Sequence, residues 1–478
     1  MSVGHNAPSL SVSRVFTLYP SLPLLDAGRY PRYKVAFCLY LESGELLNRL
    51  YPSTAALCLA LAGLSATWAA QAADVLITAD RLLDVRAGRM IPNPEILVRD
   101  GRVVSVNSKA GAAQAAEGVT RIALPGMTLV PGLIDMHVHL DSDPTYGGYK
   151  YLEYNDRFWS ALSVVHAGRT LDAGFTTVRN LGAEDWNDVG LGQAIEAGKV
   201  RGPRIIPAGW SFGPTGSHCD STYFPPSMDQ KKPYNADNPD EVRKSVRSLR
   251  KYGAQVIKVC ATGGVFSRNT EPGQQQMSLA ELRAAVEEAQ QWGLRVAAHA
   301  HGAAGIKDAI RAGVNTIEHA SLIDDEGIAL AKKHGAWLSM DIYNGDYTAA
   351  EGKKNGVLED NLRKDREVTE IQRQNFKRAH AAGVKMVFGT DAGVHPHGGN
   401  GKQFAVMVKY GMTPLQAIQS ATINAAEALA RKDLGVIEAG RYADMVAVAG
   451  DPTADVRLLE APAVVIKGGE VVKGGAPR

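Results

Sequence analysis

Short apolar runs alternate with helix-like stretches through the middle of this 478-residue chain. Eight such runs follow one another: 133–140, 176–182, 204–210, 255–264, 295–302, 315–321, 336–343 and 385–393. The stretches between them space apolar residues as helices do, as in 278–293, where Ser278 is a predicted N-cap and Gly293 a predicted stop. Alternating strand and helix patterns favour a parallel sheet. Eight repeats predict an α/β fold, a (β/α)8 TIM barrel.

A second pattern flanks this repeat on both sides. Alternating runs rich in β-branched residues, broken by Asp-Gly and Pro-Gly turns, lie at 74–85, 95–108, 121–130, 443–450 and 463–475. So many β-branched residues fit strands better than two unrelated terminal tails. We therefore expect residues 73–128 and 433–478 to combine into a small β-sandwich domain, next to a barrel domain of residues 129–432.

The first 72 residues have the features of an export signal. Residues 54–70 form an uncharged apolar core, Arg49 precedes it, and Ala70-Gln71-Ala72 has the spacing of a cleavage site. This pattern predicts a cut before Ala73 and export to the periplasm or the exterior, with no membrane attachment of the mature chain. The alternative is an uncleaved anchor, because the core is near the lower length limit of a spanning helix. Residues 1–48 are expected to come from an over-extended start site.

Charge and cysteine content argue against several partner classes. The formal net charge of +2 indicates neither nucleic-acid binding nor attraction to an acidic membrane surface. Four cysteines are too few for a disulfide scaffold. Cys219 and Cys260 lie in the predicted barrel without metal-type spacing, and are expected to be unpaired thiols.

Polar residues gather toward the C-terminal ends of the predicted barrel strands. His137 and His139 point to one face, because positions i and i+2 of a strand do so. The others are Lys258, His299, His301, His319 and Asp391. Catalytic groups of TIM barrels collect at this end, and imidazoles and carboxylates are typical metal ligands. The pattern predicts a metal centre that activates water; the alternative is a set of separate core residues.

Lys258 is unusual because it lies between Ile257 and Val259 in the middle of a predicted strand. A charged ammonium is unfavourable in such a place. One interpretation is a lysine paired with a carboxylate elsewhere in the sequence. The functional interpretation is that burial lowers its pKa, so that the neutral amine reacts with carbon dioxide. The resulting carbamate can bridge two cations.

The order HxH, Lys, His, His, Asp resembles the amidohydrolase superfamily. The resemblance extends from residue 73 to the end and includes the stretches 174–182, 412–429 and 434–446. Among its branches, the chain is most similar to the imidazolonepropionase-like and Xaa-Pro dipeptidase-like branch, which contains ochratoxin-type amide hydrolases. The resemblance implies two divalent metal ions, Zn²⁺ by preference, and a homo-oligomer. The implied ligands are His137, His139 and Asp391 for one metal, His299 and His319 for the other, and carboxylated Lys258 as the bridge.

Strand geometry does not distinguish the roles of the two histidines in His299-Ala300-His301, because both side chains face the same way. The ligand of the family matches His299, so we expect His301 to face the substrate and polarise its carbonyl group. Asp391 is expected to accept the proton of the attacking water and pass it to the leaving nitrogen.

The loops after the third and fourth strands are the predicted specificity elements. His218 and Tyr223 lie in the first loop, and Arg268 in the second is a candidate to bind a substrate carboxylate. The alternative for Arg268 is a solvated loop arginine. Residues 395–400 are a further candidate, with a plain polar loop as the alternative.

The predicted function is hydrolysis of an amide bond in a small carboxylate-bearing substrate by a hydroxide held between two metals. Dipeptides, N-acyl amino acids and ochratoxin-like amides belong to this class. The alternatives are a cyclic-amide hydrolase of the imidazolonepropionase type and a metal-bearing binding protein without turnover. The export signal favours the hydrolase of carboxylate-bearing amides over the cyclic-amide hydrolase. The complete ligand set with Asp391 argues against a binding protein without turnover.

Overall fold

The computed structural model describes residues 74–107, 118–228 and 232–474. These residues belong to one compact unit, Gln71–Arg478. The predicted leader, with its cleavage site, lies outside the described residues. Within the described ranges, no helix combines the length and apolar character that crossing a bilayer requires.

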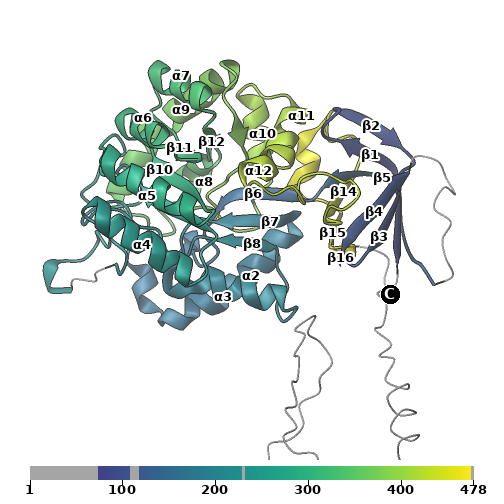
Figure 1. Cartoon of the computed structure of the whole chain (residues 1–478), viewed down its shortest axis with the longest axis horizontal. Coiled ribbons are helices and arrows are strands. Elements are labelled where there is room, and N and C mark those ends of the chain that lie inside the picture. The colour runs from purple at the N-terminus through teal and green to yellow at the C-terminus, as the bar shows by residue number, and fades with distance from the viewer. Residues whose placement is uncertain (1–73, 108–117, 229–231, 475–478) are drawn as a thin grey trace, which may run out of the picture. The chain divides into compact units, whose positions relative to one another are not determined.

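Each of the eight apolar runs contains a parallel strand. Three strands form one sheet in the order β6 (Leu133–Val138), β7 (Phe175–Asn180) and β8 (Arg204–Pro207). Five form another, in the order β13 (Met386–Val387), β12 (Trp337–Ser339), β11 (Thr316–His319), β10 (Arg295–Ala300) and β9 (Val256–Cys260). Figure 1 shows helices on the outside of these strands, as in a TIM barrel.

The two sheets meet without forming one closed ladder. Isolated bridges join Val138 to Ala392 and Phe212 to Val259. At one junction, the Asp391 amide donates to the His137 carbonyl oxygen at 2.7 Å. At the other, the Gln255 amide donates to the Pro207 carbonyl oxygen at 2.7 Å. The arrangement is therefore of the TIM-barrel type, but the described residues do not form the closed barrel sheet that the sequence predicted.

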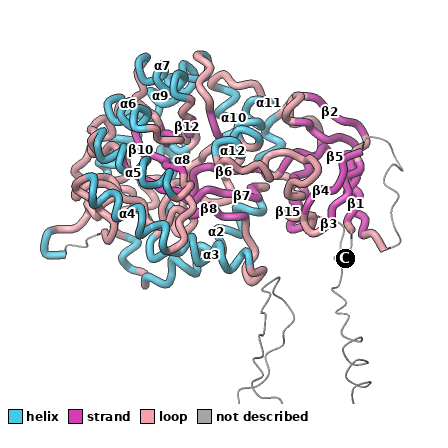
Figure 2. The backbone as a smooth tube through the Cα atoms, viewed as in Figure 1, coloured by secondary structure: helices cyan, strands magenta, loops and turns pink. Residues whose placement is uncertain are grey.

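Helices follow most of the strands and cover them (Figure 2). Their bounds are α2 Asp156–Asp172, α3 Asn187–Glu196, α4 Pro239–Lys251, α5 Leu279–Gln291, α6 Ala303–Ala312, α7 Asp325–His334, α8 Asn344–Glu351, α9 Glu359–Ala381, α10 Lys402–Lys409, α11 Pro414–Ser420 and α12 Ile423–Ala428. The predicted cap of α5 is confirmed. The Ser278 side chain accepts a hydrogen bond from the Glu281 backbone amide, and the Glu281 carboxylate accepts one from the Ser278 backbone amide. Gly293, with φ of 69°, follows the helix end.

Strands from both ends of the described chain form one mixed sheet (Figure 1). These strands are β1 Val75–Asp84, β2 Arg89–Pro92, β3 Glu95–Arg99, β4 Arg102–Asn107, β5 Thr120–Pro131, β14 Met445–Ala449, β15 Val464–Lys467 and β16 Glu470–Lys473. Ile77, Ile96, Leu129, Met445 and Ile466 are buried in its core. All eight strands are connected in a single sheet, so the two stacked sheets of the predicted sandwich are not confirmed.

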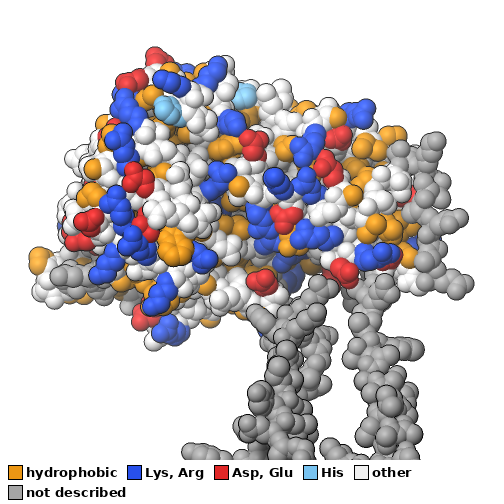
Figure 3. All heavy atoms as spheres, in the orientation of Figure 1, with side chains coloured by type: hydrophobic (Ala, Val, Ile, Leu, Met, Phe, Trp, Pro, Cys, Tyr) orange, Lys and Arg blue, Asp and Glu red, His pale blue; other side chains and the backbone are white. Residues whose placement is uncertain are grey.

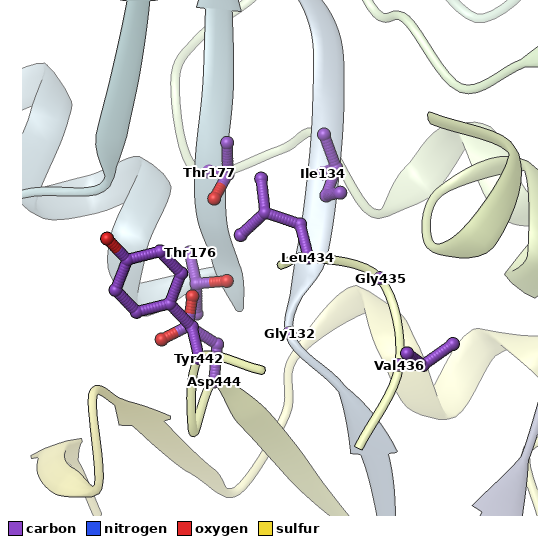
Figure 4. A pocket seen from close by; sticks show the side chains of 9 residues that line it. All are labelled: Gly132, Ile134, Thr176, Thr177, Leu434, Gly435, Val436, Tyr442 and Asp444. Atoms are coloured by element: carbon purple, nitrogen blue, oxygen red, sulfur yellow. The ribbon is translucent and has the colours of Figure 1, made fainter. Parts of the chain in front are cut away.

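The mixed sheet contacts the barrel strands at their N-terminal ends. The Gly132 amide donates to the Asp444 carbonyl oxygen at 2.8 Å, and Arg204 pairs with the Asp444 carboxylate at 2.8 Å. A cavity of about 10 Å³ lies at this junction. Figure 4 shows side chains that line it, among them Ile134, Thr176, Thr177 and Tyr442. Such a volume suits about one water molecule. This cavity is therefore too small for a substrate.

The surface carries charges of both signs. On the face in Figure 3, Lys and Arg side chains are interspersed with Asp and Glu. This mixture agrees with the small formal net charge of +2.

Candidate metal and active site

A cavity of about 640 Å³ opens at the C-terminal ends of the barrel strands. Its lining includes all seven polar residues that the sequence placed there: His137, His139, Lys258, His299, His301, His319 and Asp391. Most are buried, while the His139 side chain is 28% exposed. The strands thus bring together residues that are up to 254 positions apart, from 137 to 391.

Two clusters of possible metal ligands lie in this cavity, and a third group, His319, Asp341 and Asp391, shares one residue with each of them. In the first, His137, His139 and Asp391 place one ligand atom each within 4.8 Å of one another. Asp391 Oδ1 lies 3.4 Å from His137 Nε2 and 3.3 Å from His139 Nε2. In the second cluster, His299, His301 and His319 meet the same criterion.

Lys258 is buried beside the first cluster, with its Nζ 3.3 Å from His137 Nε2. Burial lowers the pKa of Lys258 to about 8, although the carboxylates of Glu318 and Asp391 oppose the shift. A larger fraction of neutral amine is therefore present near neutral pH than for an ordinary lysine. The neutral amine is the form that reacts with carbon dioxide.

Four of the histidines have a carbonyl or carboxylate oxygen close to one ring nitrogen. Three of these contacts are hydrogen bonds, and the contact between His137 and Glu318 is a short ion-pair distance without hydrogen-bond geometry. These contacts are His137 Nδ1 to Glu318 Oε2 at 3.2 Å, His139 Nδ1 to the Gly182 oxygen at 3.0 Å, His299 Nε2 to the Gly263 oxygen at 3.1 Å, and His319 Nδ1 to Asp341 Oδ1 at 2.9 Å. An oxygen acceptor keeps the proton on the contacted nitrogen, which leaves the other nitrogen with a free lone pair. The donor set therefore fits divalent metal ions.

His301 differs from these four histidines. Its Nδ1 lies 2.8 Å from the Ser321 hydroxyl, which can donate or accept. This contact leaves both ring nitrogens available for a proton. The geometry therefore suits both a metal-ligand role and a substrate-facing role for His301.

Burial keeps most of the cluster histidines neutral. It lowers the pKa of His137 to about 4, and those of His299 and His301 well below their ordinary value. For His319, burial also lowers the pKa, but Asp341 and Asp391 outweigh it and raise the pKa above the ordinary value. Neutral imidazole is the form that binds a metal.

A buried ion pair behind His137 was not anticipated from the sequence. Glu318 is fully buried, and its Oε1 accepts from Arg179 Nη2 at 2.8 Å. Burial raises the Glu318 pKa, but Arg179 and His137 outweigh it and hold that pKa well below its ordinary range. Arg179 also donates to the Met136 carbonyl oxygen at 2.6 Å. The pair thus fixes an ionised carboxylate beside the His137 ring.

Two candidate ligands have left-handed backbone conformations. His319 has φ of 68° and Asp391 has φ of 55°. Non-glycine residues in this region carry strain of about 1–3 kcal/mol, and such strain is concentrated at functional sites. The strained turns direct both side chains into the cavity from their strand ends.

Helix α9 forms a polar wall of the cavity. Asp365, Val368, Thr369 and Gln372 line it at intervals of three and four residues, as one helix face does. Gln372 donates to Asp341 Oδ1 at 2.9 Å, which connects this face to His319. Aromatic residues after β6 form another wall: Tyr146, Tyr151, Tyr154 and Trp159. The specificity loops predicted from the sequence are therefore only part of the lining.

The three predicted substrate residues separate in the structure. His218 lines the metal cavity, where its ring stacks on His299 with centroids 4.0 Å apart. Gly264 permits this position, because a Cβ there would overlap the His218 ring. Tyr223 and Arg268 do not line the metal cavity, but a neighbouring pocket of about 480 Å³.

The segment 395–400 supports the first cluster from behind. His397 Nε2 lies 3.0 Å from the His139 carbonyl oxygen, and Asn400 donates to Asp135 at 2.8 Å. His397 and Asn400 are buried. This segment is therefore part of the packed framework, in contrast to the plain polar loop that was the alternative.

The expectation of unpaired thiols was wrong, because Cys219 and Cys260 form a disulfide. Both cysteines line the metal cavity. The bond joins the loop after β8, next to His218, to the end of β9, two residues after Lys258. Sequence spacing did not indicate the pairing, because the two residues are 41 positions apart and meet only when β8 and β9 are neighbours.

Parallel strands in a TIM-barrel-type arrangement, with imidazoles, a carboxylate and a buried lysine at their C-terminal ends, are typical of metal-dependent hydrolases. A comparison with known families narrows this class. The model of the amidohydrolase family matches residues 128–472. The chain belongs to the amidohydrolase family, whose members are hydrolases that act on amides.

Individual relatives are similar over most of their length. Ochratoxinase of Aspergillus niger is 30% identical over 433 residues, which cover 84% of this chain and 87% of that protein. A Xaa-Pro dipeptidase, solved with methionine in its active site, is 36% identical with a TM-score of 0.79, covering 84% of this chain and all of that one. A prolidase in complex with N-methylphosphonate-L-proline is 30% identical with a TM-score of 0.77 and the same coverage.

Proposed function

We propose that the protein hydrolyses a peptide-like amide bond in a small carboxylate-bearing substrate, with two divalent metal ions at the strand ends. Dipeptides, N-acyl amino acids and ochratoxin-like amides are the candidate substrates. The observation that carries the proposal is the geometry at the strand ends: His137 Nε2 and His139 Nε2 lie 3.4 and 3.3 Å from Asp391 Oδ1, and Lys258 Nζ lies 3.3 Å from His137 Nε2. The names of the dipeptidase, prolidase and ochratoxinase relatives support the substrate class.

The metal ions would be held in two groups. His137, His139 and Asp391 would hold one ion, His299 and His319 would hold the other, and Lys258, as a carbamate, would supply oxygen ligands to the ions. When bound, such ions lower the pKa of water and polarise a carbonyl group. Zn²⁺ suits imidazole and carboxylate ligands of this kind.

The remaining steps belong to side chains of the chain itself. Asp391 accepts the proton of the attacking water and transfers it to the leaving nitrogen, since an amine leaves readily only when it is protonated. His301 donates a hydrogen bond to the oxygen of the scissile carbonyl, where negative charge develops. His218, stacked on His299, borders the same space and contacts the substrate.

The test is hydrolysis by purified protein before and after chelation, with Zn²⁺, Mn²⁺ or Co²⁺ added back. The panel contains Xaa-Pro, Xaa-Arg and Xaa-Phe dipeptides, N-acyl amino acids, ochratoxin A and a cyclic imide. We expect metal-dependent cleavage of at least one carboxylate-terminated amide. Cleavage of the cyclic substrate alone would favour the imidazolonepropionase-type alternative, and stoichiometric metal without any turnover would favour a binding protein.

We also propose that the mature protein is exported and forms a homo-oligomer. The Cys219–Cys260 disulfide supports export, because disulfides persist in oxidising compartments. N-terminal sequencing of the natural product tests the cut before Ala73, and a mature end within residues 1–48 would contradict it. Light scattering of the purified protein tests the oligomer, and a monomer would contradict that proposal.

A further inference from the structure

A second pocket of about 480 Å³ opens beside the metal cavity, and we call it the outer pocket. Its main lining residues are Tyr149, Leu152, Tyr223, Phe224, Met228 and Arg268. Leu152 also lines the metal cavity, so the two pockets are neighbours on either side of this side chain.

The outer pocket exposes apolar surface. Tyr149, Leu152 and Met228 are 42%, 45% and 52% exposed. The rings of Tyr149 and Tyr223 pack edge to face, with centroids 6.1 Å apart. Clustered apolar surface of this kind in a hollow is typical of a binding site, in contrast to scattered single exposed residues.

Arg268 supplies the only charge we find among the described residues of this lining. Its Nη1 donates to the Tyr149 hydroxyl at 3.3 Å, and within the described part of the chain it has no carboxylate partner. The nearby Arg363, in contrast, pairs with Glu271, Asp360 and Glu367. A guanidinium group without an acidic partner, beside aromatic rings, is suited to binding a carboxylate.

The metal cavity has no equivalent cation in its described lining. Apart from Lys258, its lysine is Lys232, which is paired with Glu184. Asp141, Asp365 and other carboxylates also line that cavity. In the described lining of the metal cavity, therefore, no arginine and no unpaired lysine other than Lys258 is available to bind a substrate carboxylate.

Hydrogen bonds hold the outer pocket in shape. The Arg268 amide donates to the Thr222 hydroxyl at 2.9 Å, and the Tyr149 hydroxyl donates to the Tyr223 carbonyl oxygen at 3.0 Å. The Tyr223 hydroxyl donates to Asn361 at 3.2 Å. These bonds connect the segment after β6 with the loops after β8 and β9 and with helix α9. A preformed pocket reduces the entropy lost on binding.

We propose that the outer pocket is a distal subsite for the far end of the substrate, an apolar or aromatic group that carries a carboxylate. The proposal rests on the proposed function, because the metal cavity is taken to hold the scissile amide. Arg268 binds the carboxylate, and Tyr149, Phe224 and Met228 contact the apolar part. Among carboxylate-bearing amides, the preferred substrates are then those long enough to place the carboxylate at Arg268.

The test compares peptides that share one scissile bond and end in phenylalanine, made as free acid and as carboxamide, with none, one or two residues between the bond and the phenylalanine. For the peptide whose length lets its carboxylate reach Arg268, we expect the KM of the free acid to be about tenfold lower than that of the carboxamide. This is the effect of about one charge-assisted hydrogen bond. Arg268→Gln should remove this difference through KM and leave kcat within about twofold. Arg121→Gln, which removes an exposed arginine from β5, is the matched control and should change nothing.

If the ratio of KM between free acid and carboxamide is the same in Arg268→Gln as in the unaltered protein, the proposed subsite is wrong. It is also wrong if Arg268→Gln raises KM for the shortest free-acid peptide as much as for the longer ones. If no peptide is cleaved, the proposed function fails, but the subsite remains testable by calorimetry with N-acetyl-L-phenylalanine. Saturable binding that weakens about tenfold in Arg268→Gln supports it. Absence of binding to the unaltered protein, or equal binding to both proteins, overturns it.

Discussion

At the scale of single residues, Glu318 connects stability to the metal site. Replacing it by Ala leaves Arg179 buried without its partner and removes the carboxylate beside His137. Breaking such a buried pair typically costs about 3–5 kcal/mol. We expect Glu318→Ala to lower the free energy of unfolding by this amount and to reduce the metal content, as measured by urea unfolding and elemental analysis.

The control for this prediction is Glu438→Ala, which breaks the exposed pair with Arg86. Exposed pairs contribute about 0–1 kcal/mol. Equal and small effects of the two substitutions would mean that the buried pair does not support the site.

Asp391 is the residue that we propose accepts and transfers the proton of the attacking water. Asp391→Asn keeps the size of the side chain but removes its basicity, so we expect kcat to fall by about 10²–10⁴, the usual contribution of general acid–base catalysis. Some metal should remain bound, since His137 and His139 are intact. Steady-state kinetics with metal analysis of the same sample tests this expectation, and a near-normal rate would refute the role.

The strand-end residues were predictable because strand geometry places them without knowledge of the neighbours. The spacing of His137 and His139 is an example, since i and i+2 share a face in any strand. Glu318 and Asp341 were missed because their roles depend on which ring they contact. A usable signal existed, since both are acidic residues at the ends of predicted strands. The positions of Arg268 and Tyr223 depend on loop conformation, which the pattern does not encode.

At the scale of elements, helix α9 contains a residue that reduces stability. Burial, and then repulsion from Asp341, raises the pKa of Asp365 to about 7. The folded state therefore keeps a proton on Asp365 that the unfolded chain releases near pH 4. Because of this, Asp365 does not reduce the free energy of unfolding below pH 4, but reduces it increasingly as the pH rises toward 7. We expect Asp365→Asn to increase stability at pH 8 by up to about 4 kcal/mol, at about 1.4 kcal/mol per pKa unit, with little effect at pH 4.

Asp360 at the start of the same helix is the control. Pairing with Arg363, together with Lys364, lowers its pKa despite burial, so Asp360→Asn should reduce stability above pH 4. Thermal unfolding across pH 4–8 distinguishes the two signs. A pH-independent effect of Asp365→Asn would contradict the raised pKa.

The disulfide joins two elements of the cavity wall. It closes a loop with a sequence separation of 41 residues, for which loop entropy gives about 4 kcal/mol. We expect the Cys219→Ser, Cys260→Ser double variant to lose about 2–4 kcal/mol of stability and to raise KM, because the His218 loop is released. Dithiothreitol should reproduce the loss in the unaltered protein but not in the variant. Insensitivity of the unaltered protein to reductant would contradict the account.

Strand periodicity explains why the eight barrel strands were found, since every predicted run contains one. The walls of the cavity were harder to predict. Helices α8 and α9 have ordinary helical patterns, and nothing in their spacing shows that one face of α9 lines a cavity. The shape of the small sheet was also not determined, because alternation identifies strands but not their division into one sheet or two.

At the scale of the whole molecule, one compact unit combines a mixed sheet at the N-terminal ends of the barrel strands with a polar cavity at their C-terminal ends. The contacts through Gly132 and Asp444 hold the two parts together away from the site. Stability and chemistry are therefore located at opposite ends of the strands, as is usual in this architecture. The C-terminal end can then carry strained residues such as His319 and Asp391.

The measurement that tests the central claim most directly is the metal content of the purified protein, determined on the sample whose amide hydrolysis is measured. The account predicts about two divalent ions per chain. It also predicts a loss of both metal and activity in Lys258→Ala, since the bridging carbamate can no longer form. A fully active protein without metal, or a Lys258→Ala variant with unchanged metal and turnover, would contradict it.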